Sequence, residues 1–236
     1  MTPLPNPSEL AVTLPTGAAT TALVYEAAPD AARPIDATLI LGHGAGAGQR
    51  NAFMVEFAQA LSARGIEIVT FNFLYTQQGR KIPDRAPALE ACYRAVVEAI
   101  RAHVASARRA LFVGGKSMGG RIATQVAAAD PRLPLAGLVL LGYPLHPPGK
   151  PERLRDKHLP SVGRPMLFVQ GARDAFGTPD ELAPILGTLQ PPPVVHVVAQ
   201  ADHSFKLSRK NPAAQAAIYA EIQDAIIGFV RQTSHC

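Results

Sequence analysis

The sequence predicts an α/β fold in which a doubly wound, mostly parallel sheet of about seven or eight strands carries helices on both faces. Short segments rich in Val, Ile, Leu or Phe recur along the chain, and segments with helical periodicity separate them. Most of the short segments are apolar throughout rather than alternating, which is typical of parallel strands covered on both sides. Strands that alternate with helices through right-handed crossovers produce this architecture.

Seven apolar segments have the length and composition of strands: residues 21–27, 38–42, 66–73, 110–115, 136–142, 166–171 and 194–199. Apolar residues recur every three or four positions from Leu89 to Val104 and again from Ile218 to Val230. This spacing places one apolar stripe along each segment and predicts an amphipathic helix there.

Several polar residues are of the types that commonly begin or end helices. Thr178 and Glu181 fit a capping box, and Asn211 precedes a proline that suits the first turn of a helix. Asp130 also precedes a proline, which predicts the end of the helix that follows Ser117.

The whole chain, residues 1–236, is expected to form a single domain without a separate cap, with residues 1–8 flexible. A chain of 236 residues with 47% hydrophobic and 17% charged residues can bury a full core. Residues 143–165 are irregular and rich in Pro and charge, and they are the only place for a lid. The stretch is too short and Pro-broken for a helical cap.

Composition argues against several classes of partner. The first eight residues lack the basic start and apolar run of a signal peptide, and no later segment is predicted to span a bilayer, so we expect a cytoplasmic protein with no membrane partner. The formal charge is +5, but Lys and Arg are scattered and form no nucleic-acid motif. Cys92 and Cys236 lie in no metal-binding pattern and are expected to be free thiols, and no metal or cofactor is predicted.

The strongest functional signal is a GxSxG pentapeptide, Gly115 to Gly119, with Ser117 at its centre. It lies directly after an expected buried strand and directly before an expected helix. In this context the motif predicts a sharp turn that projects the serine hydroxyl above the sheet, where the positive end of the helix favours negative charge.

A serine hydroxyl becomes a good nucleophile only when a base removes its proton and an acid orients that base. Asp174 and His203 follow the last two expected strands, in the chain order Ser, Asp, His that this turn predicts. Asp156 also follows a strand and is an alternative acid. Five other histidines are weaker candidates for the base because of their positions in the sequence: His43, His103, His146, His158 and His196.

Residues 42–48 form a glycine-rich loop after an early strand, which suits an oxyanion hole. The backbone N–H groups of Met118 and Ala45 are the expected donors. The loop spacing matches neither a dinucleotide motif nor a P-loop, which argues against nucleotide binding. Gly44, Lys116 and Tyr143 adjoin these motifs and are the expected substrate-binding residues.

The motifs HGAGAG, GGKSMGGR, LGYPLHPPG, FVQGARDAFG and ADHSF, in that order, resemble those of small α/β-hydrolases related to dienelactone hydrolase. More closely they resemble bacterial relatives of testis-expressed protein 30 and of the third subunit of the nonspecific lethal complex. The resemblance covers residues 23–230 and implies the α/β-hydrolase fold and a triad of Ser117, Asp174 and His203. Dienelactone hydrolases use a cysteine nucleophile, so their lactone specificity does not carry over to a serine.

These observations predict hydrolysis of a small carboxylic ester or thioester through an acyl-serine intermediate. The alternative is a noncatalytic interaction protein with a hydrolase fold. Lys116, Arg121 and Arg173 flank the expected nucleophile and acid, and they suggest the further hypothesis of an anionic substrate. Without a cap, the site is expected to prefer short acyl groups, since methylenes beyond the pocket stay in water.

Overall fold

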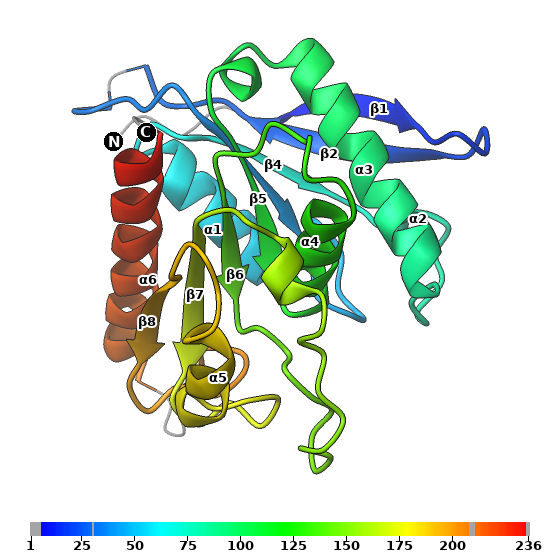
Figure 1. Cartoon of the computed structure of the whole chain (residues 1–236). Coiled ribbons are helices and arrows are strands. Elements are labelled where there is room, and N and C mark those ends of the chain that lie inside the picture. The colour runs from blue at the N-terminus through cyan, green and yellow to red at the C-terminus, as the bar shows by residue number, and fades with distance from the viewer. Residues whose placement is uncertain (1–5, 30, 208–210, 235–236) are drawn as a thin grey trace.

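The computed structural model describes residues 6–29, 31–207 and 211–234. Its centre is a single eight-stranded sheet in the order β1-β2-β4-β3-β5-β6-β7-β8 (Figure 1). The strands are β1 (Ser8–Thr13), β2 (Ala19–Tyr25), β3 (Thr38–Gly42), β4 (Glu67–Phe71), β5 (Leu111–Lys116), β6 (Gly137–Leu141), β7 (Met166–Gly171) and β8 (Val194–Val198). The pairs β1·β2 and β2·β4 are antiparallel, and all other pairs are parallel. The predicted α/β class and mostly parallel sheet are confirmed.

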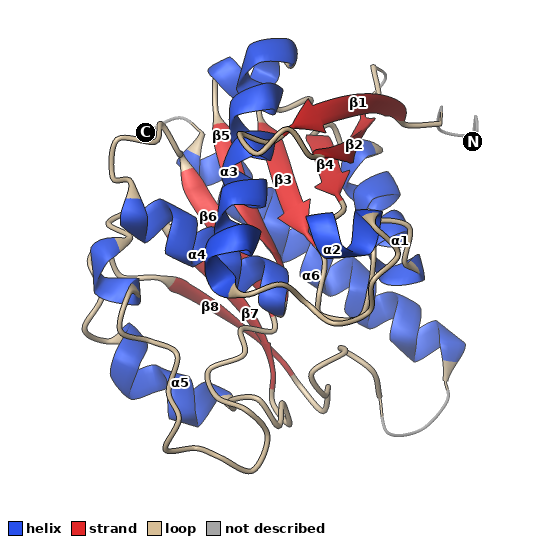
Figure 2. Ribbon diagram, turned by 90° about the vertical axis from the view of Figure 1, so that its right-hand side faces the viewer, coloured by secondary structure: helices blue, strands red, loops and turns tan. Residues whose placement is uncertain are grey.

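Helices cover both faces of this sheet (Figure 2). The helices are α1 (Ala52–Ser62), α2 (Leu74–Gln77), α3 (Ala86–His103), α4 (Met118–Ala129), α5 (Pro179–Leu186) and α6 (Pro212–Thr233), with short 3-10 turns at Ser106–Arg108 and Leu159–Ser161. Buried side chains of α3, α4 and α5 form one core with one face of the sheet, and those of α1 and α6 form a second core with the other face. Two separate cores are the expected result of a doubly wound sheet.

The predicted helix boundaries agree with the structure. Thr178 and Glu181 form both hydrogen bonds of a capping box at α5, and the Asn211 side chain accepts from the Ala214 N–H at the start of α6. The helix after Ser117 ends at Ala129, with Asp130 as its C-cap.

The first strand was not predicted from the sequence. Ser8 pairs with Val24 at the start of β1, so the expectation that residues 1–8 are flexible is wrong at Ser8, and residues 1–5 lie outside the described residues. In β1 only Val12 is buried. A half-exposed edge strand therefore lacks the continuous apolar run by which the other strands were recognised.

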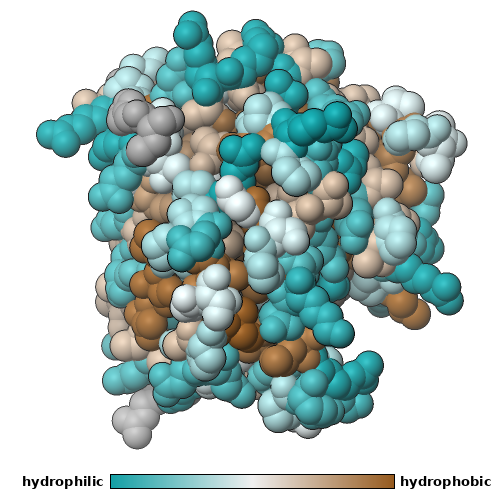
Figure 3. All heavy atoms as spheres, in the orientation of Figure 1, coloured by the Kyte–Doolittle hydropathy of each residue, from teal (hydrophilic) through white to brown (hydrophobic). Residues whose placement is uncertain are grey.

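The opposite edge of the sheet also departs from the expected pattern. Val194, Val195 and Val197 of β8 are 50%, 42% and 45% exposed. Figure 3 shows hydrophobic side chains gathered on the surface in this region. β8 is therefore apolar in sequence without being covered on both faces.

Residues 143–165 run without a helix except for the 3-10 turn Leu159–Ser161, so no separate cap domain is present. No helix in the described part of the chain is both long and apolar enough to cross a bilayer. The carboxyl ends of the parallel strands meet at one edge of the sheet, and this edge carries the segments that follow β3, β5, β7 and β8. The predicted triad and oxyanion-hole residues lie in these segments.

Candidate active site

Ser117 occupies the sharp turn between β5 and α4. Its φ of 51° and ψ of −114° lie outside the regions that residues with a Cβ favour, so the turn holds Ser117 under backbone strain. A Cβ at Gly115 would lie 2.2 Å from the carbonyl oxygen of Gly42, and one at Gly119 would lie 2.1 Å from the same oxygen. The end of β3 therefore packs directly against the turn, and both flanking positions require glycine.

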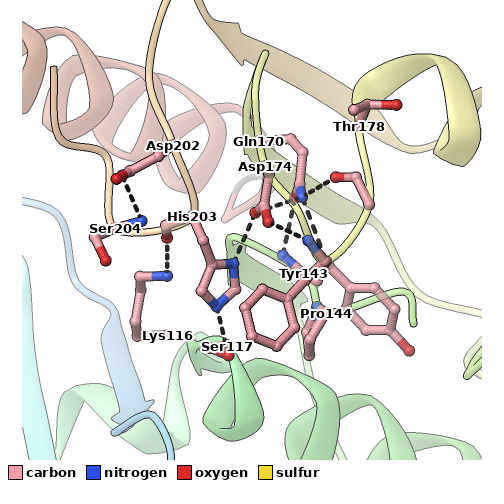
Figure 4. Close-up of polar contacts among 12 residues, drawn as sticks. Lys116, Ser117, Tyr143, Pro144, Gln170, Asp174, Thr178, Asp202, His203 and Ser204 are labelled. Carbon is pink, nitrogen blue, oxygen red and sulfur yellow. Dashed lines mark hydrogen bonds and ion pairs between the residues drawn. The ribbon is translucent and has the colours of Figure 1, made fainter. Parts of the chain in front are cut away.

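The structure brings Ser117, His203 and Asp174 together in one hydrogen-bonded chain (Figure 4). His203 Nδ1 lies 2.8 Å from Asp174 Oδ2, and His203 Nε2 lies 2.8 Å from Ser117 Oγ. An ionised carboxylate only accepts hydrogen bonds, so the ring proton sits on Nδ1. Nε2 is then left to accept from the serine hydroxyl, which is the arrangement that a general base requires.

Asp174 is 1% exposed, and its carboxylate is held from three directions. Oδ1 accepts from the Phe176 N–H at 2.8 Å, while Oδ2 accepts from His203 and from Gln170 Nε2 at 2.9 Å. The Phe176 ring also stacks on the imidazole of His203, with ring centroids 4.1 Å apart. The acid and the base are therefore fixed by the same short segment after β7.

Gln170 was not identified from the sequence as part of this site. Its side chain is fully buried, and it accepts from the Tyr143 N–H at 2.9 Å while donating to Asp174 and to the Gly177 carbonyl. A buried amide needs such partners, because leaving it unpaired costs free energy. The signal in the sequence was a single polar residue inside an otherwise apolar strand.

The alternative acid and bases do not join this chain. Asp156 makes no recorded contact with His203 in the described part of the structure, whereas Asp174 does. His43 is fully buried, with Nε2 accepting from the Phe73 N–H at 3.1 Å and Nδ1 donating to the Gly44 carbonyl at 2.8 Å. Burial lowers the pKa of His43. This neutral histidine fixes the start of the glycine-rich loop.

The glycine-rich loop lies beside the nucleophile. A Cβ on Gly44 would be 3.7 Å from the Cβ of Ser117, and Gly44, Ala45 and Met118 all line the same pocket as Ser117. The Met118 N–H is in the first turn of α4, where helical N–H groups have no partner within the helix. The two predicted oxyanion donors therefore belong to segments that adjoin Ser117, and their role stays a prediction.

Lys116 lines the pocket, but its ammonium group is bonded to another part of the chain. Nζ donates to the backbone carbonyl of His203 and lies 5.0 Å from the centroid of the Phe205 ring. Burial lowers the pKa of Lys116 to about 8, against the opposing effect of the Asp174 charge. Lys116 thus ties the strand that carries the nucleophile to the loop that carries the base.

Tyr143 was predicted to bind substrate, and the structure corrects this. Its side chain is 1% exposed, it is absent from the residues that line the pocket, and its hydroxyl donates to the Arg155 carbonyl at 2.6 Å. Tyr143 instead joins the first and later parts of the 143–165 segment. Its aromatic ring packs inside against Phe168 of β7, with the two ring centroids 5.6 Å apart.

The pocket around Ser117 has a volume of about 600 Å³. Phe53, Met54 and Leu89 are among its apolar lining residues, and Phe176 borders it beside His203. Arg121 and Arg155 also line it, whereas Arg173 is exposed, donates to the Gln200 carbonyl and does not line it. Of the arginines that sequence reasoning singled out, Arg121 alone faces the pocket, and Arg155 was missed.

Comparison with known proteins identifies the family and the fold. The model of an alpha/beta hydrolase domain family matches residues 35–231. The chain belongs to this family. Its membership agrees with the mostly parallel sheet and with the helices on both faces.

Solved structures show the same fold. A lidless serine hydrolase from Xanthomonas campestris is 23% identical, with 96% of this chain and 94% of that chain covered and a TM-score of 0.74. A serine hydrolase homologue from Coxiella burnetii is 18% identical over 95% and 96% of the two chains, with a TM-score of 0.72. A dienelactone hydrolase from Anabaena variabilis is 19% identical over 93% and 97%, with a TM-score of 0.67. The predicted likeness to dienelactone hydrolase is confirmed for the fold, and that to testis-expressed protein 30 stays a prediction.

Proposed function

We propose that this hydrolase cleaves small carboxylic esters or thioesters through an acyl-serine intermediate on Ser117. The observation that carries the proposal is the unbroken hydrogen-bonded chain from Ser117 through His203 to the buried Asp174. Family membership supports hydrolysis, and the residue types in this chain favour an acyl-transfer route.

In the first half of the reaction, Ser117 Oγ attacks the carbonyl carbon while His203 Nε2 takes the hydroxyl proton. Asp174 stabilises the resulting imidazolium, and His203 then gives the proton to the leaving alcohol or thiol. In the second half, a water molecule loses a proton to His203 and attacks the acyl group, which leaves as a carboxylic acid. The proton returns from His203 to Ser117 Oγ.

Negative charge develops on the substrate carbonyl oxygen in both halves. The N–H groups of Met118 and Ala45 are the proposed donors to this oxygen. Removal of one oxyanion-hole donor typically raises the barrier of such a reaction by about 2.7–4 kcal/mol. The N-terminus of α4 adds a favourable electrostatic field at the same place. The proposed reaction therefore uses side chains and backbone groups of the chain itself.

Turnover of a short ester and a short thioester tests the proposal. The wild-type protein should hydrolyse 4-nitrophenyl butyrate or butyryl thiocholine, and Ser117→Ala should lose this activity by several orders of magnitude. Ser161→Ala, at an exposed serine in the 3-10 turn, is the matched control and should retain full activity. Absence of turnover with both substrates, or equal activity of the two variants, would contradict the proposal and favour a noncatalytic interaction protein.

A further inference from the structure

Two arginines reach the pocket of Ser117 from different parts of the fold. Arg121 lies on α4, one helical turn after the nucleophile, and its N–H donates to the Ser117 carbonyl at 3.1 Å. Arg155 comes from the irregular segment 143–165 and is anchored through its own backbone, where its N–H donates to the Leu145 carbonyl and its carbonyl accepts from Tyr143. Both side chains line the pocket that contains Ser117 and His203.

Neither guanidinium has a carboxylate partner in the described part of the chain. Arg121 Nε is buried without a hydrogen-bond partner there, and its Nη1 reaches the Gln125 side chain only at 3.5 Å. Arg155 Nη1 lies 3.4 Å from the Pro144 carbonyl. These contacts are long and neutral, whereas a guanidinium bonds best to an oxyanion that accepts two parallel N–H groups.

The positive charges of Arg121 and Arg155 also repel each other. Burial lowers the pKa of Arg155, and the charge of Arg121 lowers it further. Among the described lining residues, Asp84 is the one acidic side chain, and it pairs with Arg80 at 2.6 Å. Lys206 adds another positive charge to the lining. The pocket thus has an excess of positive charge that an anionic ligand would neutralise.

We propose that Arg121 and Arg155 bind an oxyanion of the substrate, a carboxylate or a phosphate, so that the preferred ester or thioester is anionic. This inference rests on the proposed function for the bond that is cleaved, but the binding step can be measured without turnover. Arg121 lies on α4 close in sequence to the nucleophile, and Arg155 lines the pocket from the irregular segment 143–165. The sequence suggested an anionic substrate for Lys116, Arg121 and Arg173, and the lining of the pocket keeps Arg121 and adds Arg155.

Matched substrates that differ in charge test the proposal. Three acetate esters differ in the charge of the leaving phenol. The anionic 4-acetoxybenzoate is compared with the neutral 4-acetoxybenzamide, and 4-acetoxyphenyl phosphate distinguishes a phosphate site from a carboxylate site. On the acyl side, monoethyl succinate is compared with ethyl butyrate. We expect kcat/KM to favour an anionic member by about tenfold or more in at least one arm, as one charge-assisted hydrogen-bonded contact would provide.

Variants of the two arginines test whether Arg121 and Arg155 cause the preference for anionic substrates. In Arg155→Gln and in Arg121→Gln the ratio of anionic to neutral kcat/KM should fall by about tenfold. Arg132→Gln removes the same charge from a side chain that is 95% exposed beyond the other end of α4, and it should leave the ratio unchanged. Arg155→Gln lies in a loop, so it tests the idea even where Arg121→Gln disturbs α4.

Equilibrium binding separates a failure of this inference from a failure of the proposed function. Calorimetric titration of the Ser117→Ala variant with the same compounds needs no turnover. Tighter binding of an anionic compound that is lost with Arg155→Gln but kept with Arg132→Gln would support the site, even if the wild-type protein hydrolysed none of the esters. Equal binding and equal kcat/KM for anionic and neutral compounds, or a preference retained in both arginine variants, would overturn it.

Discussion

Replacing Gln170 with leucine removes the amide that joins β7 to the segment carrying Asp174. Leucine has a similar volume but no donor or acceptor, so the Tyr143 N–H, the Gly177 carbonyl and Asp174 Oδ2 each lose a partner. A neutral hydrogen bond contributes about 0.5–1.5 kcal/mol and one to a charged group about 1.5–3 kcal/mol. Two neutral bonds and one charged bond therefore predict a loss of about 2.5–6 kcal/mol in the free energy of unfolding.

Urea unfolding and steady-state kinetics measure the two consequences of Gln170→Leu. Because Asp174 orients His203 rather than the substrate, kcat should fall by about tenfold or more while KM changes little. Gln223→Leu is the matched control, since Gln223 is only 6% exposed but its side chain makes no hydrogen bond to the described part of the chain. Equal, small losses of stability in both variants, with kcat of Gln170→Leu unchanged, would refute this reasoning.

Three other variants or measurements test the site. Asp174→Asn should lower kcat by roughly three to four orders of magnitude, whereas Asp156→Asn should change it by less than about twofold, and the reverse result would show that the acid is misassigned. Lys116 loses its proton above a pKa of about 8, and its hydrogen bond to the His203 carbonyl then becomes neutral and weaker. We therefore expect kcat to drop a few-fold as pH rises through 8, and we expect no such drop in Lys116→Met. Because residues 143–165 form no helical cap, kcat/KM for 4-nitrophenyl esters should level or fall beyond about four acyl carbons, and a steady rise through eight would contradict an open site.

Much of the fold follows from local sequence signals. Continuous apolar runs predicted the parallel strands, and the GxSxG turn could be placed because it lies between such a run and a helix. Chain order and the ends of the last two expected strands then indicated Asp174 and His203, with Asp156 left as an alternative acid. The structure brings Asp174 and His203 together with Ser117. Signals of this kind depend only on neighbours along the chain.

The features of the site that the sequence did not predict depend on contacts between segments that are distant in the chain. Tyr143 follows a strand end, like the other site residues, but its ring lies inside, where its hydroxyl donates to the backbone carbonyl of Arg155, twelve positions later. The same loop path brings Arg155 to the pocket, and no local pattern encodes that path. Gln170 is visible in the sequence as a polar residue in an apolar strand, but the sequence does not indicate that it bonds to Asp174.

Covalent labelling of the nucleophile tests the central claim most directly. The protein is treated with a fluorophosphonate probe, digested with trypsin and mapped by mass spectrometry. We predict that the probe modifies the peptide from Ser117 to Arg121, and that His203→Ala abolishes the reaction because Ser117 then lacks its base. Labelling of a different serine, or equal labelling of the wild-type protein and the His203→Ala variant, would contradict the account.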